Sequence, residues 1–359
     1  MNRKIIILIL FLTLPFSQTI ATPSLTIDPK KETRPLTLAT FFTRPKNDSY
    51  YSLVVRFAEH VAKSYNIKLQ SYYFDHNHIE MVKKIEQVLS SNNRPDAIAF
   101  VNFKQQDETI LKIANKYKTP AFIFNSTPSK NTHSSKYFVS TVSPDDEKAG
   151  YDLAEYLIQN SKKHKDGKIY LVGIEGDPIS SASILRKQGL LRASKRHNNV
   201  VLQQIVSAYN WNKDIASSKT DLLLKRYPKS NMFWAASDSI SIGIHETLIK
   251  HDKSQDIIVG GIDWSEEGIN AVKKNKIAAT YGNQFMELGW VTILTYDFLV
   301  GNKTLIPDII NTPMQIINKD NIQTMNKYLT KECWNSFDFT KLSKTLNPSL
   351  TKYQFKIKC

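Results

Sequence analysis

The sequence predicts an α/β protein made of two doubly wound parallel-sheet lobes with a ligand cleft between them. From Leu36 onward, short apolar strands alternate with amphipathic helices, and this alternation runs through two complete series. No linker rich in proline, glycine or serine separates the two series. Alternation of this kind requires right-handed crossovers, which give a parallel sheet covered on both faces. We expect the cleft where the strand ends of the two lobes face each other.

The composition is that of a folded globular protein. The chain has 359 residues, of which 41% are hydrophobic and 23% charged, and this length fits about two domains. The formal net charge is +15, but the lysines are scattered over helix ends and loops rather than gathered in one basic stripe. We therefore expect no nucleic-acid partner.

The N-terminus has the pattern of a cleavable export signal, predicted over residues 1–21. Arg3 and Lys4 precede an apolar run that begins at Ile5, and small residues end at Ala21. The run is shorter than the ~20 residues that span a bilayer, so an uncleaved anchor is the weaker alternative. We expect cleavage after about Ala21 and a location in the periplasm.

The two cysteines, Cys333 and Cys359, both lie near the C-terminus. In an oxidising compartment they are most simply interpreted as one disulfide that closes the tail, and two unpaired thiols are the alternative. Neither cysteine belongs to a C-x-x-C motif, which disfavours a metal site or a redox enzyme.

The first series of elements extends from Leu36 to Phe124. Its clearest helix has apolar residues spaced by three and four positions between Tyr50 and Ala62. The predicted strands are Leu36 to Phe42, Leu69 to Phe74, Ala97 to Val101 and Ala121 to Phe124.

The second series follows a polar stretch from Asn125 to Lys136. We interpret Ser143 as an N-cap and Pro144 as the first helical residue, with acidic residues in the first turn. The predicted strands are Ile169 to Ile174, Val200 to Val206, Met232 to Ala236, Ile257 to Ile262 and Ile277 to Tyr281. We expect an N-terminal lobe of residues 34–140 and 284–312, a C-terminal lobe of residues 141–283 and 313–325, and a polar tail of residues 326–359.

The sequence contains no phosphate-binding loop, dinucleotide fingerprint, G-x-S-x-G or H-E-x-x-H motif. His76 and His78 lie in a polar loop, and we expect them to be solvated surface residues rather than metal ligands. We predict neither a cofactor nor a metal.

Four segments at predicted strand ends carry a family resemblance. They are Val172 to Gly189, Ala235 to Gly243, Val259 to Asp263 and Lys276 to Tyr281. Together and in this order they resemble the periplasmic sugar-binding proteins of the ribose- and galactose-binding type, over about Leu36 to Asn318. The resemblance implies a type I periplasmic binding protein fold, in which two lobes close over a ligand by hinge bending.

The resemblance also implies ligand-binding residues in the second lobe. Arg186 resembles the arginine that binds ring hydroxyls, and a surface arginine is the alternative. Asp263 matches the acceptor carboxylate, and an N-cap role could coexist with that one. Trp211 resembles the aromatic residue that stacks on the sugar, and a cover for the sheet end is its alternative.

Four further second-lobe residues match the family pattern less closely. Ser237 and Asp238 match a strand-end pair that is Asn-Asp in many relatives. Asn283 lies near the position at which the family has a ligand-binding glutamine. Gln284 could take that role equally well.

In the first lobe, the resemblance implies contacts from Asp48, Tyr50 and Tyr51, which resemble the family's Asn-Pro-Phe-Phe segment. Tyr50 also fits the apolar stripe of its helix, so Tyr51 is the better candidate. Asn125 stands where relatives often have aspartate, and Ser126 stands where many have arginine. These departures leave the identity of the ligand open.

The implied function is a non-enzymatic, monomeric solute-binding protein. It would capture a monosaccharide or a related polyol for an ABC-type permease in the inner membrane. The alternative is a co-receptor for a sensor kinase, by similarity to receptors of furanosyl quorum signals. An exported hydrolase could use Asp238 and Asp263 as an acid and base, but binding explains both residues with fewer assumptions.

Overall fold

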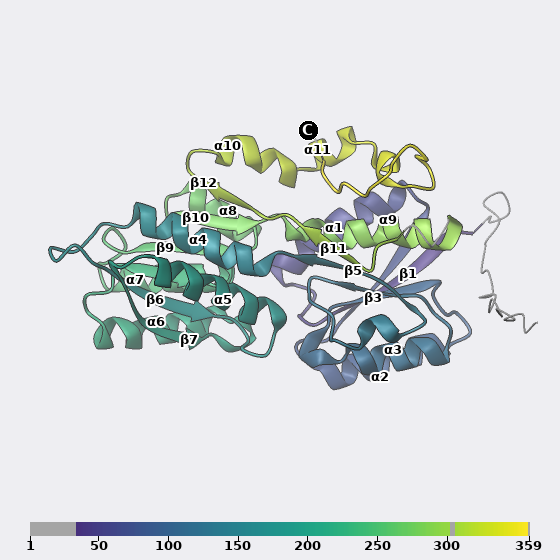
Figure 1. Ribbon diagram of the computed structural model, residues 1–359, viewed down its shortest axis with the longest axis horizontal. Coiled ribbons are helices and arrows are strands. Elements are labelled where there is room, and N and C mark those ends of the chain that lie inside the picture. The colour runs from purple at the N-terminus through teal and green to yellow at the C-terminus, as the bar shows by residue number, and fades with distance from the viewer. Residues whose placement is uncertain (1–33, 302–305, 358–359) are drawn as a thin grey trace, which may run out of the picture.

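The protein is described by a computed structural model that covers residues 34–301 and 306–357. These residues form two lobes, each built on a six-stranded sheet (Figure 1). The prediction of two doubly wound parallel-sheet lobes is confirmed. The predicted export signal, residues 1–21, lies outside the described residues. Among those described, no helix has the length and apolar character needed to cross a membrane.

The first lobe has the strand order β11-β5-β4-β3-β1-β2. Its strands, all paired in parallel, are β1 (Leu36–Phe42), β2 (Ile67–Tyr73), β3 (Ala97–Phe100), β4 (Ala121–Phe124), β5 (Phe138–Pro144) and β11 (Ile309–Thr312). Helices α1 (Ser49–Lys63) and α9 (Glu287–Val300) pack together on one face, and α2 (His78–Ser90) and α3 (Asp107–Lys116) cover the other (Figure 1). The two faces have separate apolar cores.

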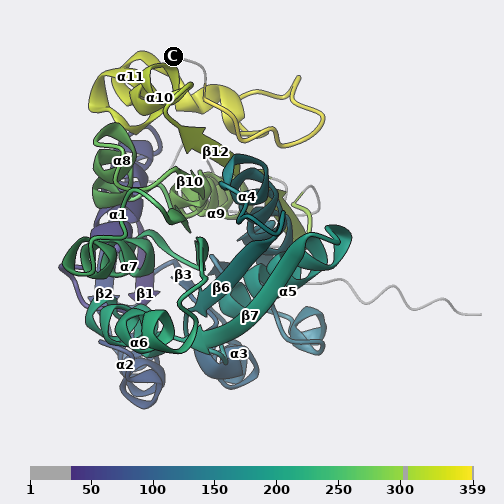
Figure 2. The ribbon, with the colours of Figure 1, turned by 90° about the vertical axis from the view of Figure 1, so that its left-hand side faces the viewer.

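The second lobe has the strand order β12-β10-β9-β8-β6-β7. Its strands are β6 (Ile169–Glu175), β7 (Val200–Ser207), β8 (Met232–Ala235), β9 (Ile258–Ile262), β10 (Ala279–Gly282) and β12 (Gln315–Asn318), and β12 alone among them is antiparallel to its neighbour. Helices α4 (Asp146–Asn160) and α5 (Ser181–Arg196) lie on one side of the sheet. Helices α6 (Lys213–Arg226), α7 (Asp238–Lys250) and α8 (Glu266–Lys273) lie on the other (Figure 2).

Three connections carry the chain from one sheet to the other. They leave β5 after Pro144, β10 after Gly282 and β11 after Thr312. The lobe limit predicted after residue 140 falls inside β5, which continues to Pro144. The three connections lie next to one another, because Thr312 donates to the Ser143 carbonyl and Asn283 to the Pro313 carbonyl. A bend in these connections could alter the cleft.

The start of α4 differs from the sequence prediction. Ser143 and Pro144 belong to β5, and Asp145 is the N-cap, with its carboxylate accepting a hydrogen bond from the Lys148 backbone nitrogen at 3.1 Å. Strand β5 was not predicted because its serines and threonine interrupt the apolar pattern. Thr141 and Ser143 are nevertheless buried. The apolar pattern does not detect buried residues that carry hydroxyl groups, so the sequence indicated an N-cap where the strand continues.

The segment predicted as a polar tail, residues 326–359, packs against the first lobe, and the short helix that precedes it packs against the second. Helix α10 (Ile322–Met325) contacts β12 and α8, and α11 (Lys331–Ser336) continues over the first lobe (Figure 1). The ring of Trp334 lies 5.3 Å from that of Phe57, edge to face. Asp297, on α9, accepts hydrogen bonds from the Lys344 backbone nitrogen at 2.8 Å and the Tyr353 hydroxyl at 2.7 Å.

Of the two cysteines predicted to form a disulfide, Cys333 is buried on α11. Cys359 lies outside the described residues, so the pairing stays a prediction.

Candidate functional site

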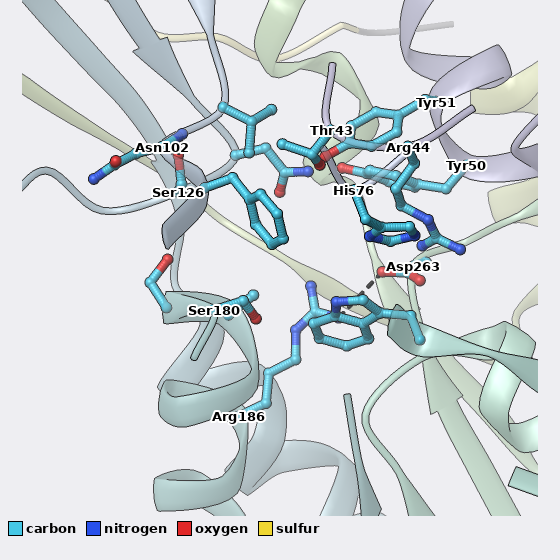
Figure 3. A pocket seen from close by; sticks show the side chains of 16 residues that line it. Thr43, Arg44, Tyr50, Tyr51, His76, Asn102, Ser126, Ser180, Arg186 and Asp263 are labelled. Carbon is cyan, nitrogen blue, oxygen red and sulfur yellow. Dashed lines mark hydrogen bonds and ion pairs between the residues drawn. The ribbon is translucent and has the colours of Figure 1, made fainter. Parts of the chain in front are cut away.

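A pocket lies between the two lobes, at the carboxyl ends of strands from both sheets (Figure 3). Together with the solvent at its mouth it has an empty volume of about 640 Å³. The lining residues are Thr43, Arg44, Tyr50, Tyr51, His76, Val101, Asn102, Phe103, Asn125, Ser126, Ser180, Ser181, Ala182, Arg186, Trp211 and Asp263.

Arg186 is the central charged group of the second-lobe wall. It lies on α5 and is 3% exposed. Its Nε donates to Asp146 Oδ1 at 2.7 Å, and its Nη1 donates to the Ala236 carbonyl at 2.7 Å and to Asp263 Oδ1 at 3.2 Å. The two carboxylates outweigh the effect of burial and raise the pKa of Arg186, so the guanidinium stays charged.

Asp263 provides the acceptor of the same wall. It directly follows β9 with a φ of 144°, in the left-handed region, and is buried. Burial raises the pKa of Asp263 to about 7, opposed by the charge of Arg186 and reinforced by Asp238. The N-cap of the following helix is Ser265, so Asp263 does not have the alternative capping role.

Trp211 forms the floor beneath these groups. It ends a 3-10 helix over Tyr209–Trp211, and the Arg186 Cζ lies 5.5 Å from the centre of its ring. A Cβ atom at Gly176 would lie 2.4 Å from the indole, so glycine is needed there for the ring to lie against the backbone. The ring offers a flat apolar face beside a charged donor and an acceptor.

The first-lobe wall begins at the N-terminus of α1. Asp48 is the N-cap, and its Oδ1 accepts a hydrogen bond from the Tyr51 backbone nitrogen at 2.9 Å. Tyr50 and Tyr51 follow in the first turn and both line the pocket, whereas Asp48 stands behind them. Burial raises the pKa of Tyr51 to about 12, so its phenol remains protonated. Asn125, with a φ of 51°, lines the pocket at the end of β4.

Ser237 and Asp238 are buried but do not line the pocket. Ser237 caps α7 by accepting from the Ile240 backbone nitrogen. Asp238 Oδ2 accepts hydrogen bonds from the backbone nitrogen and the hydroxyl of Ser265, at 2.9 and 3.0 Å. A Cβ atom at Gly268 would lie 2.0 Å from that oxygen, so the carboxylate is tightly enclosed. Asp238 thereby holds the loop that carries Asp263, whereas Ser237 stabilises the start of its own helix.

Gln284 and Asn283 also lie behind the pocket wall. Gln284 Nε2 donates to Asp263 Oδ1 at 2.9 Å, so this side chain positions the acceptor carboxylate. Asn283 instead donates to the Pro313 carbonyl at 3.1 Å, next to the β11–β12 connection.

Sequence reasoning missed several residues of the first-lobe wall, chiefly Thr43, Arg44, His76 and Asn102. The expectation that His76 is a solvated surface residue is wrong. It lines the pocket, and burial lowers its pKa. These residues belong to no motif, but each follows the end of a strand. Taking the first residues after every predicted parallel strand would have found them.

The described residues contain no group of three or more histidines, cysteines or acids that could hold a metal ion. The polar side chains of the pocket are instead arranged as hydrogen-bond donors and acceptors around an aromatic face. That arrangement suits a small ligand with several hydroxyl groups.

Comparison with known proteins links the fold to a family. A family model described as periplasmic binding protein domain matches residues 39–304. Among curated proteins, the ribose import binding protein of Salmonella typhimurium is 27% identical over 202 residues, which are 55% of this chain and 64% of that protein. The chain therefore aligns with less than two thirds of that relative.

Solved structures share the fold at low sequence identity. A periplasmic sugar-binding protein from Pseudomonas fluorescens superposes with a TM-score of 0.80 at 22% identity, covering 89% of this chain and 98% of that one. A periplasmic solute binding protein of an ABC transporter from Actinobacillus succinogenes, solved with bound D-allose, has a TM-score of 0.72 at 20% identity and covers 80% of this chain and 99% of that one.

Proposed function

Because this chain belongs to the periplasmic binding protein family, we propose that it binds one small sugar or related polyol between its two lobes. The observation that carries the proposal is the pair formed by Arg186 Nη1 and Asp263 Oδ1, 3.2 Å apart at the pocket wall, with the Arg186 guanidinium over the ring of Trp211. A sugar ring needs charged donors, a carboxylate acceptor and a flat apolar surface, and these three residues offer all of them.

The ligand-binding residues in this proposal are those that line the pocket from opposite lobes. Arg186, Trp211 and Asp263 belong to the second lobe, and Tyr51 and Asn125 to the first. A ligand that contacts both walls favours the closed arrangement over the open one by the contacts it adds. Asp48, Asp238 and Gln284 act as positioning residues behind this wall.

The proposed protein binds its ligand without transforming it. A glycoside hydrolase would need two carboxyl groups on either side of the scissile bond. The candidate pair was Asp238 and Asp263, and Asp238 is enclosed by Ser265 and lies outside the pocket lining. This supports binding rather than hydrolysis.

We place the proposed receptor in the periplasm, after removal of residues 1–21, and we propose the Cys333–Cys359 disulfide for the same oxidising compartment. Its partner would be an ABC-type permease of the inner membrane. The support comes from the family and from the names of the relatives, one a ribose import protein and one an ABC transporter component.

Native mass spectrometry of the protein purified from its own cells tests the proposal. We expect a species heavier than the mature chain by one neutral, hydroxyl-rich molecule, which is released on denaturation. The variant Asp263→Asn should lose that species, whereas Asp221→Asn, on the surface of α6, should keep it. The proposal fails if no such molecule accompanies the protein and no uncharged monosaccharide or polyol binds to it in calorimetry.

A further inference from the structure

Two polar side chains of the first-lobe wall already form hydrogen bonds with other groups of the protein. Ser126, at the position where many relatives carry arginine, accepts from the Asn102 backbone nitrogen at 2.8 Å and donates to the Phe124 carbonyl at 3.0 Å. The Asn102 side chain donates to the Thr127 carbonyl and accepts from the Asp107 backbone nitrogen. The Ser126 hydroxyl therefore has no hydrogen left to donate to a ligand, and the uncharged Asn102 amide has one.

Arg44 has the donor capacity that these residues lack. It follows β1, lines the pocket, and forms an ion pair of 2.7 Å between its Nη2 and Asp48 Oδ2. Its Nε is buried and has no hydrogen-bond partner in the protein. The Arg44 side chain as a whole is 19% exposed and lines the pocket, so the outer part of its guanidinium, rather than Nε, is the part that a ligand oxygen can reach.

Asp48 holds this guanidinium in a fixed position. The Asp48 carboxylate uses Oδ1 to cap α1 and Oδ2 to bind Arg44, and its side chain is 7% exposed. The ion pair and the helix cap together fix the orientation of the arginine, so little conformational entropy remains to be lost when a ligand binds.

Arg44 faces the acceptor on the opposite lobe. Figure 3 shows its guanidinium pointing toward Asp263 across the pocket, and its positive charge acts to lower the pKa of Asp263. A ligand between the lobes would therefore meet one guanidinium from each side, Arg44 from the first lobe and Arg186 from the second.

The charges around the pocket are already balanced by the protein. Arg44 is paired with Asp48, and Arg186 is paired with Asp146 and Asp263. Burial lowers the pKa of His76, which favours its neutral form. An anionic ligand would have to be buried beside carboxylates with no cation left to neutralise it.

We propose that Arg44 determines specificity at this site, by donating a hydrogen bond from its guanidinium to a ligand oxygen, and that the ligand is an uncharged sugar or polyol rather than a sugar acid. The inference rests on the proposed function and deepens it. In this role Arg44, which follows β1, provides the first-lobe donor. Ser126, which follows β4, does not provide it.

The test is calorimetric titration of the mature protein with a panel of aldoses that includes ribose and D-allose, and with the corresponding aldonates. Arg44→Lys keeps a positive charge next to Asp48 but removes the planar guanidinium with its several donors. We expect it to weaken binding of the best aldose by about tenfold to a hundredfold, since that is the range for a hydrogen bond to a charged group. Arg56→Lys, an exposed arginine on α1, is the matched control and should bind like the parent.

A second variant, Arg44→Gln, keeps the test valid if the lysine variant does not fold, and thermal unfolding identifies that case. It should also bind the aldose at least about tenfold more weakly. Parent-like affinity in a folded variant overturns the role of Arg44 while leaving the sugar-binding function intact. Tighter binding of an aldonate than of its aldose overturns the uncharged class. Absence of binding by the parent across the whole panel overturns the function and this inference together.

Discussion

At the scale of the residue, the site depends on a carboxyl group that titrates near neutral pH. Asp263 contacts Arg186 and Gln284 through Oδ1 and lies where a ligand hydroxyl could donate to it. Burial is the main reason that its pKa is about 7 rather than about 4. We therefore expect the ionisation of Asp263 to control how well it accepts a hydrogen bond from a ligand.

We expect affinity to rise as the pH increases through about 7 and to level off above it. The sign follows because a ligand hydroxyl donates to the ionised carboxylate, whereas a protonated carboxyl loses this acceptor at low pH. The dependence should reach at most about tenfold per pH unit below the pKa. Calorimetric titrations at a series of pH values measure it.

The control for this pH dependence is Asp263→Asn, which keeps the shape of the side chain and cannot ionise. It should bind more weakly at high pH and show a flatter profile. A steep profile that persists in this variant would assign the pH dependence to another group, such as Asp238, whose pKa burial raises to about 6.

Residues that belong to a family motif could be found from the sequence, and residues defined only by their place in the fold could not. Arg186, Trp211 and Asp263 match the family motifs and line the pocket. Arg44 and His76 match none, and they reach the pocket because the parallel sheet brings the ends of β1 and β2 together. Their identification therefore needed the three-dimensional structure.

At the scale of the element, the long strand and helix segments were predictable and the short or polar ones were not. The apolar stripe of α1 predicted its helix because nine of its residues are buried. Strands β11 and β12 have four residues each, with several exposed positions, and contain no apolar run that would mark them as strands. Their hydrogen bonds to neighbouring strands define them instead.

The C-terminal tail is the clearest case in which an element is defined by its packing. Trp334 is 2% exposed and packs edge to face against Phe57, and Phe355 stacks on Trp290 at 4.9 Å. The sequence around these aromatic residues is too polar to suggest a buried segment, yet the rings complete the outer core of α1 and α9.

We expect Trp334→Ala to destabilise the protein by about 3 to 5 kcal/mol, the usual effect of removing a large buried ring. Urea unfolding measures the loss. Sugar affinity should stay unchanged, because Trp334 does not line the pocket. Leu346→Ala, a tail residue that is 45% exposed, is the control and should cost well under 1 kcal/mol. An equal, small effect of both variants would show that the tail does not stabilise the first lobe.

At the scale of the whole molecule, the fold explains why a ligand site forms between the lobes. Each sheet presents the carboxyl ends of its parallel strands to the other, and three connections join the sheets. The sequence predicted this architecture because two strand-helix series without a linker have few other ways to bury their apolar faces. The tail, which follows α10 and packs over the first lobe, is an addition that periodicity did not predict.

The most direct test of the central claim is a crystal structure of the protein with the small molecule that accompanies it from its own cells. We expect electron density for one sugar or polyol on the ring of Trp211, with oxygen atoms within hydrogen-bond distance of Arg186 and Asp263 and a first-lobe contact from Arg44. A ligand bound elsewhere, or a closed form in which Arg186 and Asp263 do not face a common cavity, would contradict the account.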